Sequence, residues 1–401
     1  MIGFLQIAER EIAETPCRNR FRRQSCESGR KFVTQSASQI PLRQRKARVT
    51  ISHLADALGL TKGTVSRAMN GYPDISATTQ NRVRRQAEIM GYRPLAQAQA
   101  IRTGRTRALG LVLQTDVPDA QRPFLSDFLA GLTRAASDEN WTLTVATSGG
   151  GEEMLSTLSR LVDERKADGF ILPRSFYDDP RAKLLRALEV PFVLYGRVAD
   201  TTGCAWFDVL GEEAMREAVQ RLADHGHRRI AFVNGGLEYN FSHLRAAGFR
   251  DGMADVGLEV DEALVMDGAM TTEAGQAAAM RLLQMDNPPT AIVFAVDVVA
   301  LGAYQAAARL GLEIGRDLSI ISYDGSPEGA WARPPLTTFH VDSREAGSRL
   351  ANLLIRCIRG ADPETLRETA RATLQLGGSD GPPQMTSETI ARRVQTAVTS
   401  H

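Results

Sequence analysis

The chain has 401 residues, a formal net charge of +1 and a globular composition, with 43% apolar and 24% charged residues. This composition excludes disorder along most of the chain, and the length predicts two or three domains. No uncharged apolar run reaches the roughly 18 residues that a membrane-spanning helix needs, so we expect no membrane partner.

The charges are distributed unevenly along the chain. Residues 1–107 contain 20 Lys and Arg against 7 Asp and Glu, a balance of +13. The remaining residues contain 28 against 40, a balance of −12. A basic end joined to an acidic body indicates that the end binds nucleic acid. A solvated basic arm without a partner is the alternative that charge alone leaves open.

The first elements in chain order are an arm and three short helices. Residues 1–47 are rich in Arg, Ser and Gln without a sustained apolar period, which predicts a disordered basic arm. Residues 48–93 predict a helical headpiece. Gly59 ends its first helix, Thr61 caps the second, and Ser76 caps the third.

The first two helices have the spacing of a helix-turn-helix. Such a unit needs a small residue where the helices cross, a glycine at the turn and an apolar residue that locks the second helix in place. Ala55, Gly59 and Val65 meet these demands. A helical hairpin without a DNA role is the alternative interpretation.

Beyond the headpiece, residues 94–106 predict a short hinge helix, and residues 107–377 alternate between strand and helix patterns. The predicted strands are Leu109–Leu113, Leu143–Ala146, Phe170–Leu172, Phe192–Tyr195, Ile230–Val233, Ala291–Ala295 and Ser319–Tyr323. This alternation predicts an α/β body of doubly wound parallel sheets, long enough for two lobes. Residues 378–401 begin with a Gly- and Pro-rich stretch and are predicted to be a flexible tail without leucine heptads.

Several short motifs support a family resemblance. They are Val49-Thr50-Ile51, Gly59-Leu60-Thr61, Thr64-Val65-Ser66-Arg67, Asn70-Gly71, Gly226-His227-Arg228-Arg229-Ile230 and Pro334-Pro335-Leu336-Thr337-Thr338. Together they closely resemble landmarks of the LacI/GalR family of bacterial repressors. The resemblance extends to about residue 377 and implies an all-α headpiece followed by a body that is similar to periplasmic sugar-binding proteins.

The resemblance implies that the second helix enters the major groove of DNA. Lys62, Gly63 and Arg67 match the positions at which the family reads bases, and Gly63 lacks a side chain for this task. The predicted phosphate contacts, which could instead be caps or core residues, are Thr50, Thr61, Thr64 and Ser66.

The segment 94–106 resembles the family's hinge helix, which folds on operator DNA. Ala98 and Ile101 are predicted DNA contacts there. Ile101 takes the place of a leucine that wedges into the minor groove. A plain inter-domain linker is the alternative.

The body is expected to bind a small ligand between its two lobes. Arg245 matches the family's ligand-binding arginine, and Asp324 matches a carboxylate at the end of a strand, where α/β sheets bind ligands. Phe124 matches a first-loop residue that lines the cleft.

Three further residues are cleft candidates of lower weight. Asp297 matches the second residue of the family's Asn-Asp pair and either contacts the ligand or caps a helix. Trp206 and Met270 could also line the cleft, although Trp206 could equally belong to the core.

These patterns predict a homodimeric regulator, a repressor of sugar-uptake or catabolic genes, with operator DNA and a small sugar as partners. A corepressor-type regulator with a purine-like ligand and a sugar-binding module without DNA function are the alternatives. No motif of an enzyme occurs in the right context. The four scattered cysteines indicate no metal site and favour the cytoplasm, and we expect no cofactor.

Overall fold

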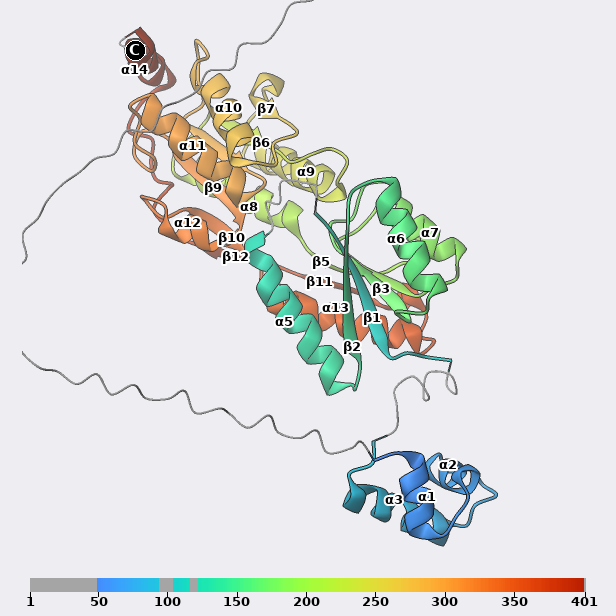
Figure 1. Cartoon of the computed structure of the whole chain (residues 1–401). Coiled ribbons are helices and arrows are strands. Elements are labelled where there is room, and N and C mark those ends of the chain that lie inside the picture. The colour runs from blue at the N-terminus through green and yellow to red at the C-terminus, as the bar shows by residue number, and fades with distance from the viewer. Residues whose placement is uncertain (1–48, 94–103, 116–121, 400–401) are drawn as a thin grey trace, which may run out of the picture. The chain divides into compact units, whose positions relative to one another are not determined.

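The computed structural model of the chain describes residues 49–93, 104–115 and 122–399 (Figure 1). They form two compact units that divide after Arg93. The predicted arm at 1–47 and most of the hinge segment, including Ala98 and Ile101, lie outside the described residues. Within the described ranges, no helix combines the length and apolar content needed to cross a membrane.

The first unit consists of α1 (Ile51–Leu58), α2 (Lys62–Met69) and α3 (Ala77–Met90), as the sequence predicts. Each helix begins at a hydroxyl cap. The side chains of Thr50, Thr61 and Ser76 accept hydrogen bonds from backbone amides three residues further on. Gly59 ends α1 with a φ of 66°, a left-handed conformation that glycine adopts without the strain a Cβ would cause.

Apolar side chains from all three helices form the core of the headpiece. Ala55 and Val65, which the helix-turn-helix spacing singled out, are 2% and 0% exposed. The other buried members of the cluster are Leu54, Leu58, Ala68, Val83 and Ala87. A core of this size is small, so each of its contacts accounts for a large share of the unit's stability.

The body contains two six-stranded sheets with the same strand order, which confirms the predicted α/β architecture. The first sheet has the order β11-β5-β4-β3-β1-β2. Its strands are β1 (Ala108–Gln114), β2 (Thr142–Ser148), β3 (Gly169–Leu172), β4 (Phe192–Tyr195), β5 (Ala205–Val209) and β11 (Arg367–Ala370). All of these strands pair in parallel.

Helices cover both faces of this sheet and complete lobe 1. They are α5 (Arg122–Asp138), α6 (Glu152–Asp163), α7 (Pro180–Ala187) and α13 (Ser343–Ile358). Successive strand residues point to opposite faces. Leu111 and Ile171 therefore pack with α5 and α13, whereas Val112 and Phe170 pack with α6 and α7.

The second sheet has the order β12-β10-β9-β8-β6-β7, with β12 antiparallel to β10. Its strands are β6 (Ile230–Val233), β7 (Val265–Met266), β8 (Ala291–Phe294), β9 (Ser319–Asp324), β10 (Thr337–His340) and β12 (Thr373–Gln375). The helices of lobe 2 are α8 (Gly211–Asp224), α9 (Asn240–Asp255), α10 (Thr272–Leu283), α11 (Asp297–Arg309), α12 (Pro327–Trp331) and α14 (Ser387–Thr399). The short 3-10 helices η1 (Glu262–Leu264) and η2 (Pro363–Thr365) complete the elements of the body.

The chain passes between the lobes three times, from β5 to α8, from β10 to α13 and from β11 to β12. All seven strands predicted from the sequence are present. The strands that the sequence did not indicate are β5, β7, β10, β11 and β12. All five are short and lie at or next to a sheet edge, where a continuous apolar run is not required.

The predicted flexible tail is wrong for residues 378–399, because this segment packs on lobe 2. Ser379 donates a hydrogen bond of 2.6 Å to the carbonyl of Ile320 and is fully buried. Asp380 forms an ion pair of 2.6 Å with Arg221. The apolar face of α14 then inserts Ile390 and Val394 into the core of lobe 2. The apolar face of α14, which is too short for a coiled coil, therefore packs against lobe 2 of the same chain.

Candidate functional site

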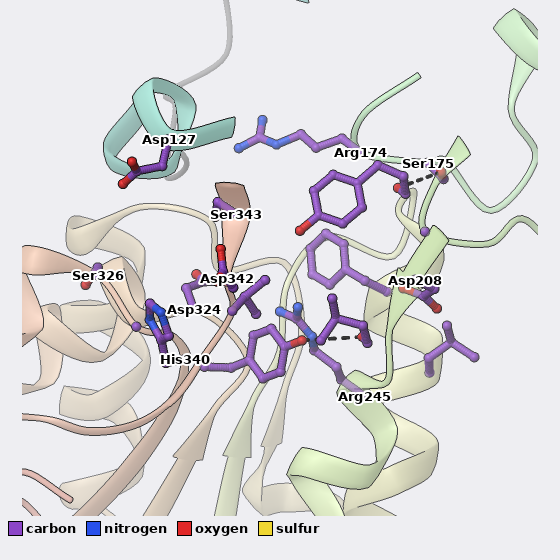
Figure 2. A pocket seen from close by; sticks show the side chains of 18 of the residues that line it. Asp127, Arg174, Ser175, Asp208, Arg245, Asp324, Ser326, His340, Asp342 and Ser343 are labelled. Carbon is purple, nitrogen blue, oxygen red and sulfur yellow. Dashed lines mark hydrogen bonds between the residues drawn. The ribbon is translucent and has the colours of Figure 1, made fainter. Parts of the chain in front are cut away.

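A cavity of about 450 Å³ lies between the two lobes of the body (Figure 2). Its wall includes the last residues of four strands, namely Tyr195, Val209, Asp324 and His340. The carboxyl ends of the strands in both sheets therefore converge on one space, which is where open α/β sheets bind ligands. The size falls within the range of small-molecule sites.

Arg245 enters this cavity from α9. Its guanidinium carbon lies 3.9 Å from the ring centre of Tyr323 and 4.6 Å from that of Phe241. One of its terminal nitrogens donates a hydrogen bond to the carbonyl of Ala295. Its buried Nε has no hydrogen-bond partner among the described residues. Two rings and a backbone carbonyl thus hold the side chain in place.

Close helix packing fixes the position of Arg245. A Cβ added at Gly248, one turn further along α9, would lie 2.0 Å from the carbonyl oxygen of Glu212 on α8. A Cβ at Gly211 would lie 2.9 Å from Nε of Arg245 itself. The two glycines allow α9 and its arginine to approach the first inter-lobe crossover.

Asp324 is the last residue of β9, and its φ of 134° is unusual for a residue other than glycine. Burial raises the pKa of its carboxyl from 3.8 to about 7, and the nearby Arg245 guanidinium opposes this shift. Arg245 and Asp324, both predicted from the sequence, therefore line one cavity, as a stacked cation and a buried carboxyl group.

An ion network that sequence reasoning missed lies beside them. Arg197, just after β4, contacts Asp208 of β5 and Glu212 of α8, each at 2.5 Å. Burial raises the pKa of Asp208, and the Arg197 guanidinium opposes this shift. The network connects lobe 1 to the first helix of lobe 2. Its position directly after a predicted strand was the signal that could have found Arg197.

Arg174 and Ser175, which were also missed, come from the loop after β3. Arg174 has a φ of 53° in the left-handed region. Figure 2 shows its side chain extending over the cavity toward the side where Asp127 lies. Both residues follow the predicted strand Phe170–Leu172, so the position that could have indicated Arg197 could have indicated them as well.

The cavity wall does not include Asp297, Trp206 or Met270, which corrects their placement as cleft residues. Asp297 is buried at the start of α11, and its carboxylate accepts hydrogen bonds from Ser326 and Thr338, both at 2.7 Å. It thereby holds a loop that lines the cavity. Trp206 packs against the α6 and α7 side of lobe 1. The side chain of Phe124 lies outside the described part of the chain.

The headpiece leaves part of α2 open to solvent. Lys62, Gly63 and Arg67 are exposed, and an added Cβ at Gly63 would meet only the Thr61 hydroxyl, at 3.7 Å. Arg67 forms an ion pair with Asp74 and lies 5.5 Å from the ring centre of Tyr72.

Three of the four predicted phosphate-contact residues make side-chain hydrogen bonds within the headpiece. The hydroxyls of Thr50 and Thr61 cap helices, and the Thr64 hydroxyl contacts that of Thr61 at 2.9 Å. The remaining candidate, Ser66, is half-buried on α2.

Comparisons with known proteins agree on the kind of protein this chain resembles. Residues 219–379 match the family described as a periplasmic binding protein-like domain. The HTH-type transcriptional regulator AglR of Rhizobium meliloti is 36% identical over 340 residues, which is 83% of this chain and 95% of AglR. The HTH-type transcriptional regulator RafR of Escherichia coli is 31% identical and covers 80% of this chain and 95% of its own length.

Solved structures show the same similarity. The structure titled transcriptional regulator CelR-cellobiose complex has a TM-score of 0.65 and 28% identity, and covers 83% of this chain and 100% of its own. The structure of the lac repressor dimer bound to operator and an anti-inducer has a TM-score of 0.69 at 24% identity and covers 84% of this chain and 100% of its own, which supports the fold.

Proposed function

The chain belongs to the LacI/GalR family of DNA-binding transcriptional regulators, and on that premise we propose that it represses sugar-uptake or catabolic genes until a small neutral sugar binds between its lobes. It acts as a homodimer on operator DNA in the cytoplasm. Its relatives are regulators of transcription, and we assign no catalytic step to the cavity.

The observation that carries this proposal is the charge pattern of the cavity. Four arginines and four aspartates line it, so their formal charges cancel. They are Arg174, Arg197, Arg245, Arg344, Asp127, Asp208, Asp324 and Asp342. A polyol needs both donors and acceptors for its hydroxyl groups, and this wall supplies both. An excess of positive charge favours a phosphorylated or nucleotide ligand, and the formal charges of this wall do not supply one.

Two aromatic rings of the cavity count against a purine corepressor. A purine would be held between two flat rings. Here the rings of Tyr323 and Phe241 are stacked on the Arg245 guanidinium, so their faces are occupied by the cation.

The ligand acts on DNA binding through the arrangement of the lobes. Two headpieces of a dimer read a pseudo-palindromic operator, because protein and DNA share a dyad. A sugar that favours one lobe arrangement changes the spacing of the headpieces. The resulting coupling is about 1–3 kcal/mol and is reciprocal.

Two measurements test this function. A thermal-shift panel of neutral mono- and disaccharides, sugar phosphates and purines should give a rise of several degrees with one neutral sugar. The same sugar should then release the protein from upstream DNA in a gel shift, whose salt dependence should be steep because the basic headpiece contacts phosphates. A rise with a purine that tightens DNA binding would replace the repressor-inducer proposal with the corepressor alternative.

A further inference from the structure

One side of the cavity is closed by a direct backbone connection between the lobes. The amide of Tyr177 in lobe 1 donates to the carbonyl of Glu238 in lobe 2 at 2.8 Å. The amide of Asn240 in lobe 2 donates to the carbonyl of Ser175 in lobe 1 at 3.1 Å. Together they make an antiparallel bridge centred on Phe176 and Tyr239. We call residues 174–177 and 238–241 the inter-lobe bridge.

Aromatic stacking reinforces this bridge. The rings of Phe176 and Tyr239 lie 5.2 Å apart and nearly parallel, and Tyr239 is only 4% exposed. Tyr239 also stacks on Phe241 at 5.5 Å, and Phe241 lines the cavity. Next to them, the rings of Tyr177 and His243 lie 4.3 Å apart. A continuous row of rings therefore runs from the bridge to the ligand wall.

A buried ion pair holds the lobe 1 side of the bridge. Asp179 and Arg181 are 3% and 5% exposed and lie 2.7 Å apart. Asp179 accepts a hydrogen bond of 3.1 Å from the amide of Phe176, and Arg181 donates one of 2.9 Å to the carbonyl of Arg174. The Arg181 guanidinium also lies 5.0 Å from the centre of the Phe176 ring. The loop is therefore fixed on both sides of Phe176.

The bridge places cavity residues of the two lobes against one another. Arg174 and Ser175 directly precede Phe176, and both line the cavity. Ser175 is tied to lobe 1 by a hydrogen bond of 3.0 Å to the carbonyl of Tyr195. Figure 2 shows Ser175 on the opposite side of the cavity from Ser326. Separating the lobes on the Ser175 side would break two backbone hydrogen bonds and a ring stack.

We propose that Phe176 and Tyr239 are positioning residues for effector recognition. Their bridge holds the Arg174 and Ser175 wall of lobe 1 against the Phe241 and Arg245 wall of lobe 2. The inference rests on the proposed function of the cavity as an effector site, but the bridge can be measured without any effector.

The test compares Tyr239→Ala and Tyr239→Phe in the full chain. Hydrogen exchange is followed in peptides that span residues 174–178 and 238–242. Both peptides should be protected in the parent protein and in Tyr239→Phe, which keeps the ring, and should exchange faster in Tyr239→Ala. Cellobiose affinity, measured by calorimetry, should fall roughly tenfold in Tyr239→Ala and stay within about twofold in Tyr239→Phe.

Phe249→Leu serves as the matched control. Phe249 stacks on Phe232 at 4.8 Å in the core of lobe 2 and does not line the cavity. This change should lower the melting temperature without altering exchange at 174–178 or cellobiose affinity. If Tyr239 had a purely structural role, Tyr239→Ala would behave like Phe249→Leu, with a lower melting temperature but unchanged exchange at 174–178 and unchanged cellobiose affinity. This result would overturn the proposal.

Two other outcomes are also informative. Equal exchange at both peptides in the parent and in Tyr239→Ala would overturn the bridge itself. A parent protein that does not bind cellobiose would exclude this disaccharide as the effector, and the affinities would then be compared with the neutral sugar that the thermal-shift panel identifies. The exchange comparison would then still decide whether the bridge holds the two walls together.

Discussion

The headpiece and the body differ in how each positions its functional side chains. In the headpiece, seven buried apolar residues hold three short helices, and the exposed Lys62, Gly63 and Arg67 lie on the same helix as the buried Val65. In the body, Arg245 and Asp324 come from distant elements and meet only because two sheets bring their strand ends together. A site carried by one helix is lost when that helix is disrupted. A site built from distant elements can lose the side chains of one element while those of the other elements stay in place.

The largest expected effect follows from Val65→Asp. An unpaired charge at this fully buried position should unfold the small headpiece and abolish operator binding. The body should keep its own melting transition and its sugar-dependent shift, because the headpiece is a separate unit. Fluorescence anisotropy with operator DNA and a thermal-shift assay measure the two properties. Loss of the sugar response in this variant would contradict the independence of the two units.

Arg245→Ala should impair sugar binding and leave operator binding intact, which is the opposite of the effect expected for Val65→Asp. Removing the stacked guanidinium takes a charged donor from the cavity, and sugar affinity should fall by roughly 100-fold. Operator binding without sugar should be retained. Arg250→Ala is the matched control, because this arginine lies on the same helix and its pair with Glu262 is solvent-exposed. Equal sugar affinity in the two variants would remove Arg245 from the site.

Ile390→Ala tests how much the packing of α14 contributes to the stability of the body. The side chain is fully buried in the core of lobe 2, so its truncation should cost about 2–4 kcal/mol of unfolding free energy. Val398→Ala on the same helix should cost less than about 0.5 kcal/mol, because Val398 is 51% exposed. Chemical denaturation monitored by circular dichroism distinguishes them. Similar values would mean that α14 is not docked in solution.

Lys62→Ala and Arg67→Ala should each weaken operator binding by about tenfold. Part of the Arg67 effect should come from its lost contacts with Asp74 and Tyr72, which hold the side chain in place. Arg250→Ala in the body is a control that removes one positive charge without touching the headpiece. An operator affinity unchanged by Lys62→Ala would place the reading surface elsewhere in the headpiece.

The buried Asp324 carboxyl should make the stability of the body depend on pH. Its folded pKa, raised to about 7, exceeds the ordinary value of 3.8, so the folded protein keeps a proton that the unfolded chain has lost. The corresponding stability is fully present below the ordinary value and is lost as the pH rises to about 7. Asp324→Asn should therefore flatten the decline of melting temperature across this range. Asp208 and Asp297 also have raised pKa values, so some decline should remain. An unchanged slope would indicate that the Asp324 carboxyl is ionised throughout.

Sequence patterns predicted much of the fold, because the relevant physics is local. The caps at Thr50 and Thr61 and the turn at Gly59 depend on a few neighbouring residues, and all three are as predicted. The strand patterns identified the buried strands β1, β3, β4, β6, β8 and β9 and also the edge strand β2, and they missed β5 and β10. They failed at the short edge strands β7 and β12, whose neighbours on the sheet, not their own hydropathy, define them.

The candidate site was predicted only in part. The family resemblance indicated Arg245 and Asp324, and the structure brings both to the cavity. The same resemblance left Asp297 open between a ligand contact and a helix cap, and in the structure its carboxylate accepts a hydrogen bond from the amide of Ser326. A motif identifies a position along the chain. It does not show whether the side chain faces the ligand or the layer behind it.

Three features follow from the sequence alone: the helix-turn-helix, the alternation of strands and helices, and the separation of charge between a basic end and an acidic body. Residue spacing defines the first two, and composition defines the third. Tertiary structure alone decided which side chains share the cavity, including Arg174 and Arg197. It also decided the raised pKa of Asp324, the docking of α14 and the pairing of Phe176 with Tyr239. These features arise between segments far apart in the chain, where burial and contact depend on how the two sheets are folded together.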